Sequence, residues 1–344
     1  MMPTNTGPSR ATLPAVVDDK NWRSLPVPDR IAAIENIFLY HPEVSRALQR
    51  LEHMFHAGRG MGVLMHGPDK VGIGSLIKRF AQTHPARERK PIALQPVIVS
   101  TPTSKLSAAG LAESISCDAG WPPFFGASSK IPELQIDNLF RRSETRMLFL
   151  LRASLLANGR TTIAPESIPF IINILDRAAV TFILAGRENL PDLVMKCPDL
   201  RDAFFQDMPV APLPMDEHWL AMIGTLATEL PFEETELTKD DMPERLHNAS
   251  EGKTPDLMPL VKTASTVAYY EDRSPVLRVE HFKRAFSYIR RPSRTDNPFD
   301  AGVAAQSFHV RKSQTAENTK RDVNRDALRI ANRDSRRARF ENLM

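Results

Sequence analysis

The chain has 344 residues, 42% of them hydrophobic, which is enough for one large or two smaller folded domains. Its two cysteines, Cys117 and Cys197, exclude a disulfide-rich framework and favour a reducing, cytoplasmic location. No run of about 18 uninterrupted apolar residues occurs, so no membrane span is expected, and the first residues lack the pattern of a secretory signal.

Positive charge is concentrated at the end of the chain. The formal net charge is +4, yet residues 311–344 contain ten Lys or Arg and five Asp or Glu, a local charge of +5. The rest of the chain therefore carries about −1. This asymmetry predicts a tail that meets an anionic partner.

Strand and helix patterns alternate through the first two thirds of the sequence. Residues 1–29, rich in Pro, Thr, Asn and Asp, predict a flexible N-terminal arm. Amphipathic spacing predicts helices over 30–40, 42–55, 74–84, 104–115, 131–144 and 167–178. Apolar runs predict buried strands over 61–65, 96–102, 147–151 and 180–186. This alternation is typical of the α/β class, in which a parallel sheet is covered by helices on both faces.

The strand signals fade after Pro214. The following segments all have helical spacing, over 218–230, 240–250, 256–271 and 278–289. We therefore predict an α/β domain at 30–211, a small all-helical domain at 212–290 and an extended basic C-terminal tail at 291–344.

The stretch HGPDKVGIGSLIKRF (66–80) has the outline of a phosphate-binding loop. Gly67 and Gly72 have the spacing of G-x-x-x-x-G-K-[ST], a pattern in which Lys contacts the phosphates and the hydroxyl holds Mg²⁺. Ile73 stands where Lys is expected, and Gly74 stands where Ser or Thr is expected. The turn and the helix start could still bind an anion.

Two interpretations of this loop stay open. It could be a strand–turn–helix with no ligand, or a nucleotide site that uses Lys70 or Lys78 in place of the missing lysine. The candidate nucleotide-binding residues are Gly67, Lys70, Gly72, Ile73, Gly74 and Ser75.

A second requirement of such a site is an acidic pair after a neighbouring strand. One carboxylate holds the metal and the other polarises the attacking water. After the apolar run at 147–150 come Leu151 and Arg152, and no carboxylate follows before Glu166. This predicts that no metal–phosphate site is complete, so Mg²⁺ is not expected and no other metal site is indicated.

The order of the motifs resembles the TniB family of transposition proteins. It runs HP-x-V-x-x-AL-x-x-L at 41–51, the G-x-x-x-x-G loop with KRF at 78–80, TP at 101–102, RML at 146–148 and LAG at 184–186. The family consists of AAA+ ATPases similar to the TnsC and MuB regulators. The resemblance implies an AAA+-like P-loop domain followed by a helical lid.

The resemblance also implies partners. In addition, it shows on which residues of this chain the functional residues of the family fall. It implies binding to DNA, contact with a transposase and a target-selection protein, assembly into rings or filaments, and a bacterial cytoplasmic setting. The family Lys and hydroxyl fall on Ile73 and Gly74, and the family Asp-Glu pair falls on Leu151 and Arg152. The trans-acting arginine of the family falls on Ala203.

The altered motif positions have one thing in common: each has lost a group that ATP hydrolysis needs. Arg201 lies two residues from Ala203 and could be an offset substitute, and Arg187 holds the polar position after the strand at 180–186. We predict an adapter or regulator that is not an ATPase and has no catalytic residues. ATP binding without hydrolysis stays open.

The basic tail contains an arginine stripe. Four arginines are spaced four apart, and in a helix each step of four turns them by only about 40°. The stripe and the two arginines that follow it comprise Arg321, Arg325, Arg329, Arg333, Arg336 and Arg337. It is either a solvated basic segment paired with nearby Asp or a surface that binds nucleic acid or an acidic protein.

Two further functions remain open. The chain could be an active ATPase with a non-standard loop, which uses Lys70 or Lys78. It could instead be a structural partner that joins an intact paralogue in a mixed ring.

Overall fold

The computed structural model describes residues 22, 25–57, 60–103, 106–121, 132–157, 161–178, 180–289 and 296–300. Most of the predicted N-terminal arm, and all of the predicted tail except 296–300, lies outside these residues. None of the helices in the described ranges is long and apolar enough to cross a membrane.

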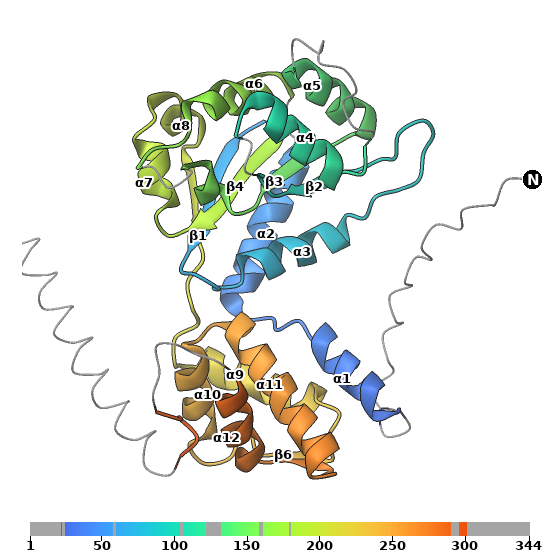
Figure 1. Cartoon of the computed structure of the whole chain (residues 1–344), viewed down its shortest axis with the longest axis vertical. Helices are drawn as coiled ribbons and strands as arrows, with labels where there is room; N and C mark the ends of the chain where they lie inside the picture. The colour runs from blue at the N-terminus through green and yellow to red at the C-terminus, as the bar shows by residue number, and fades with distance from the viewer. Residues whose placement is uncertain are drawn as a thin grey trace, which may run out of the picture. The chain divides into compact units, whose positions relative to one another are not determined.

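A five-stranded parallel sheet forms the centre of the first part of the chain (Figure 1). Its order is β2-β3-β4-β1-β5, which places β1 between β4 and β5. The strands are β1 (Gly62–Gly67), β2 (Val97–Ser100), β3 (Met147–Leu150), β4 (Thr181–Arg187) and β5 (Gln206–Pro209). Because all pairs are parallel, the carboxyl ends of the strands meet at one edge of the sheet.

Side chains along each strand alternate between two apolar clusters. On β1, Val63 and Met65 face one cluster and Leu64 faces the other, and on β3 Phe149 and Leu148 alternate in the same way. This period of two is expected of a strand that is buried on both sides. The alternation explains why the predicted strands are continuous apolar runs.

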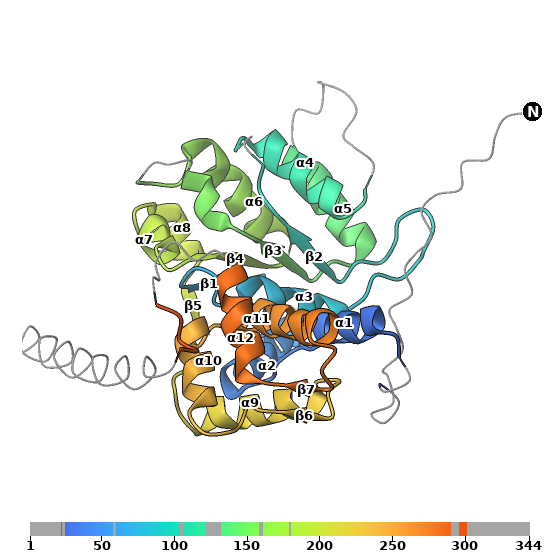
Figure 2. The same ribbon diagram turned by 60° about the horizontal axis from the view of Figure 1, so that its bottom comes forward.

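Helices cover both faces of this sheet (Figures 1 and 2). Helices α2 (Pro42–Ala57) and α3 (Ile73–Thr83) pack on one face and form with it the α2–α3 cluster. Helices α4 (Ala108–Asp118), α5 (Pro132–Ser143) and α6 (Ile168–Ala178) pack on the other and form the α4–α6 cluster. Short helices complete this part: α7 (Leu190–Met195), α8 (Pro198–Ala203) and two 3₁₀ turns at Ala153–Ala157 and Pro165–Ser167.

The C-terminal region is helical, as predicted. Its helices are α9 (Glu217–Glu229), α10 (Met242–Ser250), α11 (Thr254–Thr266), which continues as a π-helical turn at Val267–Glu271, and α12 (Val279–Tyr288). Helix α1 (Val27–Asn36) precedes the sheet domain in sequence. A stacked Phe232–Tyr269 pair, with ring centroids 4.3 Å apart, belongs to the core of this helical region.

The structure adds elements that the sequence did not predict. Strand β5 has only one buried residue, Met208, so it has no apolar run to reveal it. The predicted all-helical region also contains two parallel two-residue strands, β6 (Glu234–Thr235) and β7 (Val276–Leu277). They are too short to produce an alternating pattern.

The chain divides into two compact units. One unit comprises 38–226 and 250–259 and includes the whole five-stranded sheet. The other comprises 1–37, 227–249 and 260–344. Helices α9 and α11 contribute residues to both units. The predicted division at 211 and 212 stays a prediction.

Candidate functional site

The loop after β1 requires glycine at its first position. A Cβ on Gly67 would lie 2.2 Å from the carbonyl oxygen of Val210 and 2.9 Å from Cγ1 of Val71. The next residues turn sharply, since the amide of Val71 donates to the carbonyl of Pro68 at 3.2 Å. Gly72 then has φ +111°, a left-handed conformation that favours glycine, and it is the N-cap of α3.

The first turn of α3 keeps the features of an anion site. Its N-cap has no capping side chain, and the first turn contains no acidic residue. The unpaired amides and the helix dipole therefore leave positive potential at this end. The backbone at the start of α3 therefore has the geometry with which a helix N-terminus accepts a phosphate.

Ile73 and Gly74 occupy the two positions of this turn at which the motif has Lys and Ser or Thr. Ile73 is half-buried and packs on the α2–α3 cluster. Gly74 and Ser75 are exposed, and a Cβ on Gly74 would meet no atom within 4 Å. The position after Gly72 thus contributes to the core and supplies neither a cation nor a hydroxyl.

Lys70, the cation inside the loop, has a carboxylate partner. Its Nζ lies 3.5 Å from Oδ1 of Asp256 in the first turn of α11. The side chain of Lys70 is 69% exposed and that of Asp256 is 20% exposed. A Cβ on Gly72 would lie 3.6 Å from both Pro255 and Thr254. The loop therefore lies against the start of α11, and all these residues belong to one compact unit.

A second ion pair joins the loop to β4. Arg187 directs its Nε to Oδ1 of Asp69 at 3.3 Å, and its Nη2 lies 3.5 Å from Oδ2. The amide of Arg187 also donates to Oγ of Ser154 at 3.2 Å, which ties it to the 3₁₀ turn after β3. Asp69 and Arg187 neutralise each other, so this pair adds no excess positive charge beside the loop for a phosphate to meet.

The end of β3 lacks an acid. Leu151 is half-buried and packs on the α2–α3 cluster, whereas Arg152 is exposed and has a left-handed φ of 53°. Because β1, β3 and β4 are parallel, these two residues follow β3 at the same edge of the sheet as the loop after β1. In the described part of the chain, no group of His, Cys, Asp or Glu could hold a metal ion.

The two residues considered for a trans-acting arginine lie on α8. Ala203 is half-buried and packs on the α4–α6 cluster. Arg201 is exposed, and its Nε lies 3.0 Å from Oδ1 of Asp202. Lys78 is exposed on α3, beyond the turn that forms the loop. The six tail arginines predicted to meet an anion lie outside the described residues.

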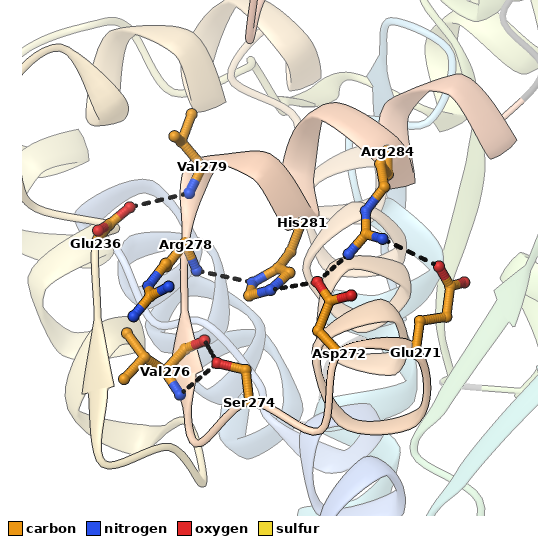
Figure 3. Close-up of polar contacts among 9 residues, drawn as sticks. All are labelled: Glu236, Glu271, Asp272, Ser274, Val276, Arg278, Val279, His281 and Arg284. Atoms are coloured by element: carbon orange, nitrogen blue, oxygen red, sulfur yellow. Dashed lines mark hydrogen bonds and ion pairs between the residues drawn. The ribbon is translucent and has the colours of Figure 1, made fainter.

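A separate polar network surrounds His281 at the start of α12 (Figure 3). Its Nδ1 accepts the amide of Arg278 at 2.9 Å, and its Nε2 lies 3.0 Å from Oδ2 of Asp272, which also pairs with Arg284. Burial lowers the pKa of His281 below its usual 6.5, against the opposing pull of Asp272. Ser274 bonds to the backbone of Val276, so this hydroxyl is not aimed at the histidine. The arrangement caps a helix and offers no nucleophile.

Neither carboxylate that pairs with the loop region was predicted from the sequence. Asp256 is 186 positions from Lys70, so no local pattern could pair them. The Thr254–Pro255 pair is nevertheless a typical helix start, and it marks where α11 begins. Asp69 lies inside the loop, but its partner Arg187 is 118 positions away, so no local pattern could pair them either.

Comparison with known proteins gives a family and a fold. The family model described as "Bacterial TniB protein" matches residues 30–210. The structure is similar to the Aeropyrum pernix ORC1 protein in complex with DNA (TM-score 0.54, 15% identity, covering 75% of this chain and 69% of that one). It is similar to the Aeropyrum pernix ORC2 protein (TM-score 0.53, 14%, 76% and 72%). It is also similar to Drosophila ORC bound to DNA (TM-score 0.51, 11%, 84% and 71%). A search of curated proteins gave no match.

Proposed function

This chain belongs to the TniB family of bacterial transposition proteins and has an AAA+ fold, and on that premise we propose that it is a DNA-binding adapter that does not hydrolyse ATP. In this proposal it connects target DNA with a transposase and a target-selection protein. It acts as an oligomer, either a ring or filament of its own copies or a mixed assembly with a paralogue.

The observation that carries the absence of hydrolysis is the packing of Ile73 and Leu151. Phosphoryl transfer in AAA+ sites depends on a lysine, a metal and a carboxylate that act on charges in the transition state. Ile73 and Leu151 both pack on the α2–α3 cluster, so the positions that would carry the lysine and the first carboxylate are partly buried apolar positions against the core. Losing such groups costs orders of magnitude in rate.

The loop keeps one feature that supports nucleotide binding without turnover. The uncapped start of α3 offers backbone amides to a phosphate. Against this, Arg187 is paired with Asp69 and Lys70 with Asp256, so neither cation is left unbalanced to bind a polyphosphate. We therefore expect weak binding at most, which does not require Mg²⁺.

DNA binding rests on the family and on the tail. The similar structures of Aeropyrum pernix ORC1 and Drosophila ORC were solved with DNA, and we carry DNA binding over to this chain as part of the proposal. The arginine stripe at 321–333 would supply phosphate contacts that do not depend on base sequence.

ATP turnover by the full chain tests the absence of hydrolysis. We expect no turnover above background, both in the wild type and in Ile73→Lys/Gly74→Thr, because that variant still lacks the acidic pair. The alternative is an active ATPase that uses Lys70 or Lys78. Turnover in the wild type that Lys70→Met or Lys78→Met abolishes would establish that alternative.

DNA affinity as a function of salt tests the adapter role. We expect the full chain to bind duplex DNA equally with and without ATP. Neutralising Arg321, Arg325 and Arg329 to Gln should flatten the slope of log affinity against log salt by about 0.9 for each phosphate that the tail no longer neutralises. Arg46→Gln, an exposed change on α2, serves as the matched control. If the stripe variant keeps the wild-type slope, the tail does not bind phosphates.

The mixed-assembly alternative makes a different prediction. A structural partner of an intact paralogue would bind no DNA alone and would enter the oligomer only with that paralogue. Co-purification with the paralogue, together with absent DNA binding by the isolated chain, would favour it.

A further inference from the structure

The tail begins at an anchored point on the helical region. Phe299 is only 4% exposed. Its ring lies 5.7 Å from the ring of Phe282 and 6.1 Å from that of Phe286, both on α12. A buried aromatic ring with two aromatic neighbours holds a segment firmly. We call residues 297–300 the tail anchor.

Polar contacts hold the same segment. Arg245 on α10 donates through Nη1 to the carbonyl oxygens of Asp300 at 3.2 Å and Pro298 at 3.4 Å. The amide side chain of Asn297 donates to the carbonyl of Lys283 at 2.9 Å. Lys283 in turn pairs with Asp300 at 2.6 Å. The anchor therefore fixes the start of the tail between α10 and α12.

A pocket of about 460 Å³ lies beside the tail anchor, and Phe299 forms part of its wall. It lies within one compact unit and is lined by residues of α10, α12 and the segment before α10. Its charged lining consists of Glu236, Lys239, Asp240, Asp241, Arg245, Glu280 and Lys283.

The cations of this pocket are already neutralised. Lys239 pairs with Glu234, Arg245 with Asp241 at 2.7 Å, and Lys283 with Asp300. Two of these carboxylates, Glu234 and Asp300, lie outside the lining. Glu234 and Asp300 neutralise Lys239 and Lys283. The lining therefore contains more carboxylates than unneutralised cations.

Two carboxylates have no such partner. Asp240 and Glu280 are exposed, and within the described ranges neither forms an ion pair; Asp240 nevertheless helps to raise the pKa of Lys239, which is already paired with Glu234. The hydrogen bond from Arg245 holds the pKa of Asp241 below its usual range, so that carboxyl also stays ionised. The pocket thus has a net negative charge that faces solvent and can receive a cation.

We propose that this pocket docks the arginine stripe of the chain's own tail. The tail anchor supplies Phe299 to the wall of the pocket, and the tail beyond it carries the opposite charge, +5 over 311–344. The segment from Asp300 to Arg321 can span up to about 70 Å when extended, so distance is no obstacle. Closing a loop of this length also costs little more than closing a shorter one.

The chemistry of the stripe favours an anionic surface. Arginines four apart on a helix repel one another, so the segment gains stability when carboxylates lie against it. The fork of a guanidinium binds a carboxylate through two parallel hydrogen bonds. In the docked state the stripe is covered. A polyanion such as a DNA backbone, which presents more negative charge than the pocket, would compete for it.

Limited trypsin digestion of the full chain tests the docking. Docked arginines are protected, so Asp240→Asn/Glu280→Gln should raise the cleavage rate at Arg321 to Arg337 about two- to tenfold, as expected from the loss of two exposed charge pairs. Glu233→Gln, an exposed neighbour outside the pocket, should leave the rate unchanged. Circular dichroism confirms that the variants are folded. Equal rates in all three proteins would overturn the proposal.

Zero-length carbodiimide cross-linking identifies the occupant. Lys312 and Lys320 of the tail should couple to Asp240 or Glu280, and the products should disappear at high salt. Mixing isotopically heavy and light chains distinguishes cross-links within one chain from cross-links between two chains. Links within one chain support the proposal. Links only between heavy and light chains would assign the pocket to the tail of a second copy, and links to other carboxylates alone would show that the tail docks elsewhere. Neither test involves ATP or DNA, so failure here is separate from failure of the adapter function.

Discussion

Lys70 Nζ lies 3.5 Å from Asp256 Oδ1, which joins the loop after β1 to the first turn of α11. In a nucleotide site the charge near this loop would be balanced by phosphate. Here a carboxylate of the same chain supplies the negative charge. The ion pair therefore keeps a cation at the loop without a bound nucleotide.

Breaking that pair should change stability little. Lys70 is 69% exposed, and exposed ion pairs contribute about 0–1 kcal/mol. We expect Lys70→Met and Asp256→Asn each to lower the free energy of unfolding by less than about 1 kcal/mol, measured by chemical denaturation. Lys78→Met, on the exposed part of α3, is the control. A larger loss in Lys70→Met would mean that the pair stabilises the fold.

The two glycines at the ends of the loop motif should respond oppositely to alanine. A Cβ on Gly67 would overlap the carbonyl of Val210, so Gly67→Ala should cost about 2 kcal/mol or more. A Cβ on Gly74 would meet nothing within 4 Å inside a helix. Gly74→Ala should therefore leave stability unchanged or raise it by up to about 1 kcal/mol. Thermal unfolding of both variants checks the contrast, which equal effects would contradict.

Removing the aromatic ring of the tail anchor should release it. Phe299→Ala should cost about 3 kcal/mol of local stability, because it leaves a cavity beside Phe282 and Phe286. Hydrogen exchange should rise at 296–300 and along α12, with the sheet unaffected. Tyr288→Ala, at a side chain that is 61% exposed, should change neither. Unchanged exchange in Phe299→Ala would show that the anchor does not depend on this ring.

Stability should fall as the solution becomes acidic, and His281 should account for part of the fall. Burial lowers the folded-state pKa of His281 below 6.5, so below pH 6.5 the unfolded chain binds a proton that the folded chain does not. The unfolding free energy should be level above this pH and decline below it, by at most about 1.4 kcal/mol per pH unit for one site. Burial lowers the pKa of His41 as well, and it adds to the same trend.

Substitution separates His281 from the other histidines. His281→Gln preserves an acceptor for the amide of Arg278 and removes the titrating ring, so the pH dependence should flatten. His53→Gln, at an exposed position, should retain the wild-type profile. Denaturant titrations between neutral and mildly acidic pH make the comparison, and an unflattened profile in His281→Gln would assign the decline to other groups.

The central fold could be predicted because its strands are buried on both sides. An apolar run such as 147–151 has few alternatives to a strand inside a parallel sheet. Strand β5 could not be predicted in the same way, because Gln206 and Asp207 are polar and the strand lies at the sheet edge. Helices α7 and α8 have six residues each, too few for a helical period to be evident.

The site was only partly predictable, for a different reason. The position of the loop and of Leu151 and Arg152 at one sheet edge follows from strand direction alone. The partners of Lys70 and Arg187 are set by tertiary contacts across 186 and 118 positions, which no local pattern encodes. The sequence predicted which motif positions are altered, but no local pattern could predict that Ile73 and Leu151 pack on the same cluster.

Strand β1 is hydrogen-bonded on both sides, to β4 and to β5, while Asp69 and Lys70 of the loop that follows it are exposed. The stability of the sheet and the chemistry at its edge are therefore encoded by separate residues. A change at 69 or 70 leaves the hydrogen bonds of β1 in place, although position 70 has a left-handed φ of 59° that limits the residues suited to it. The scaffold is consequently suited to grafting, in which new ligand specificities are installed at 69–70 while Gly67 and the strand before it are left untouched.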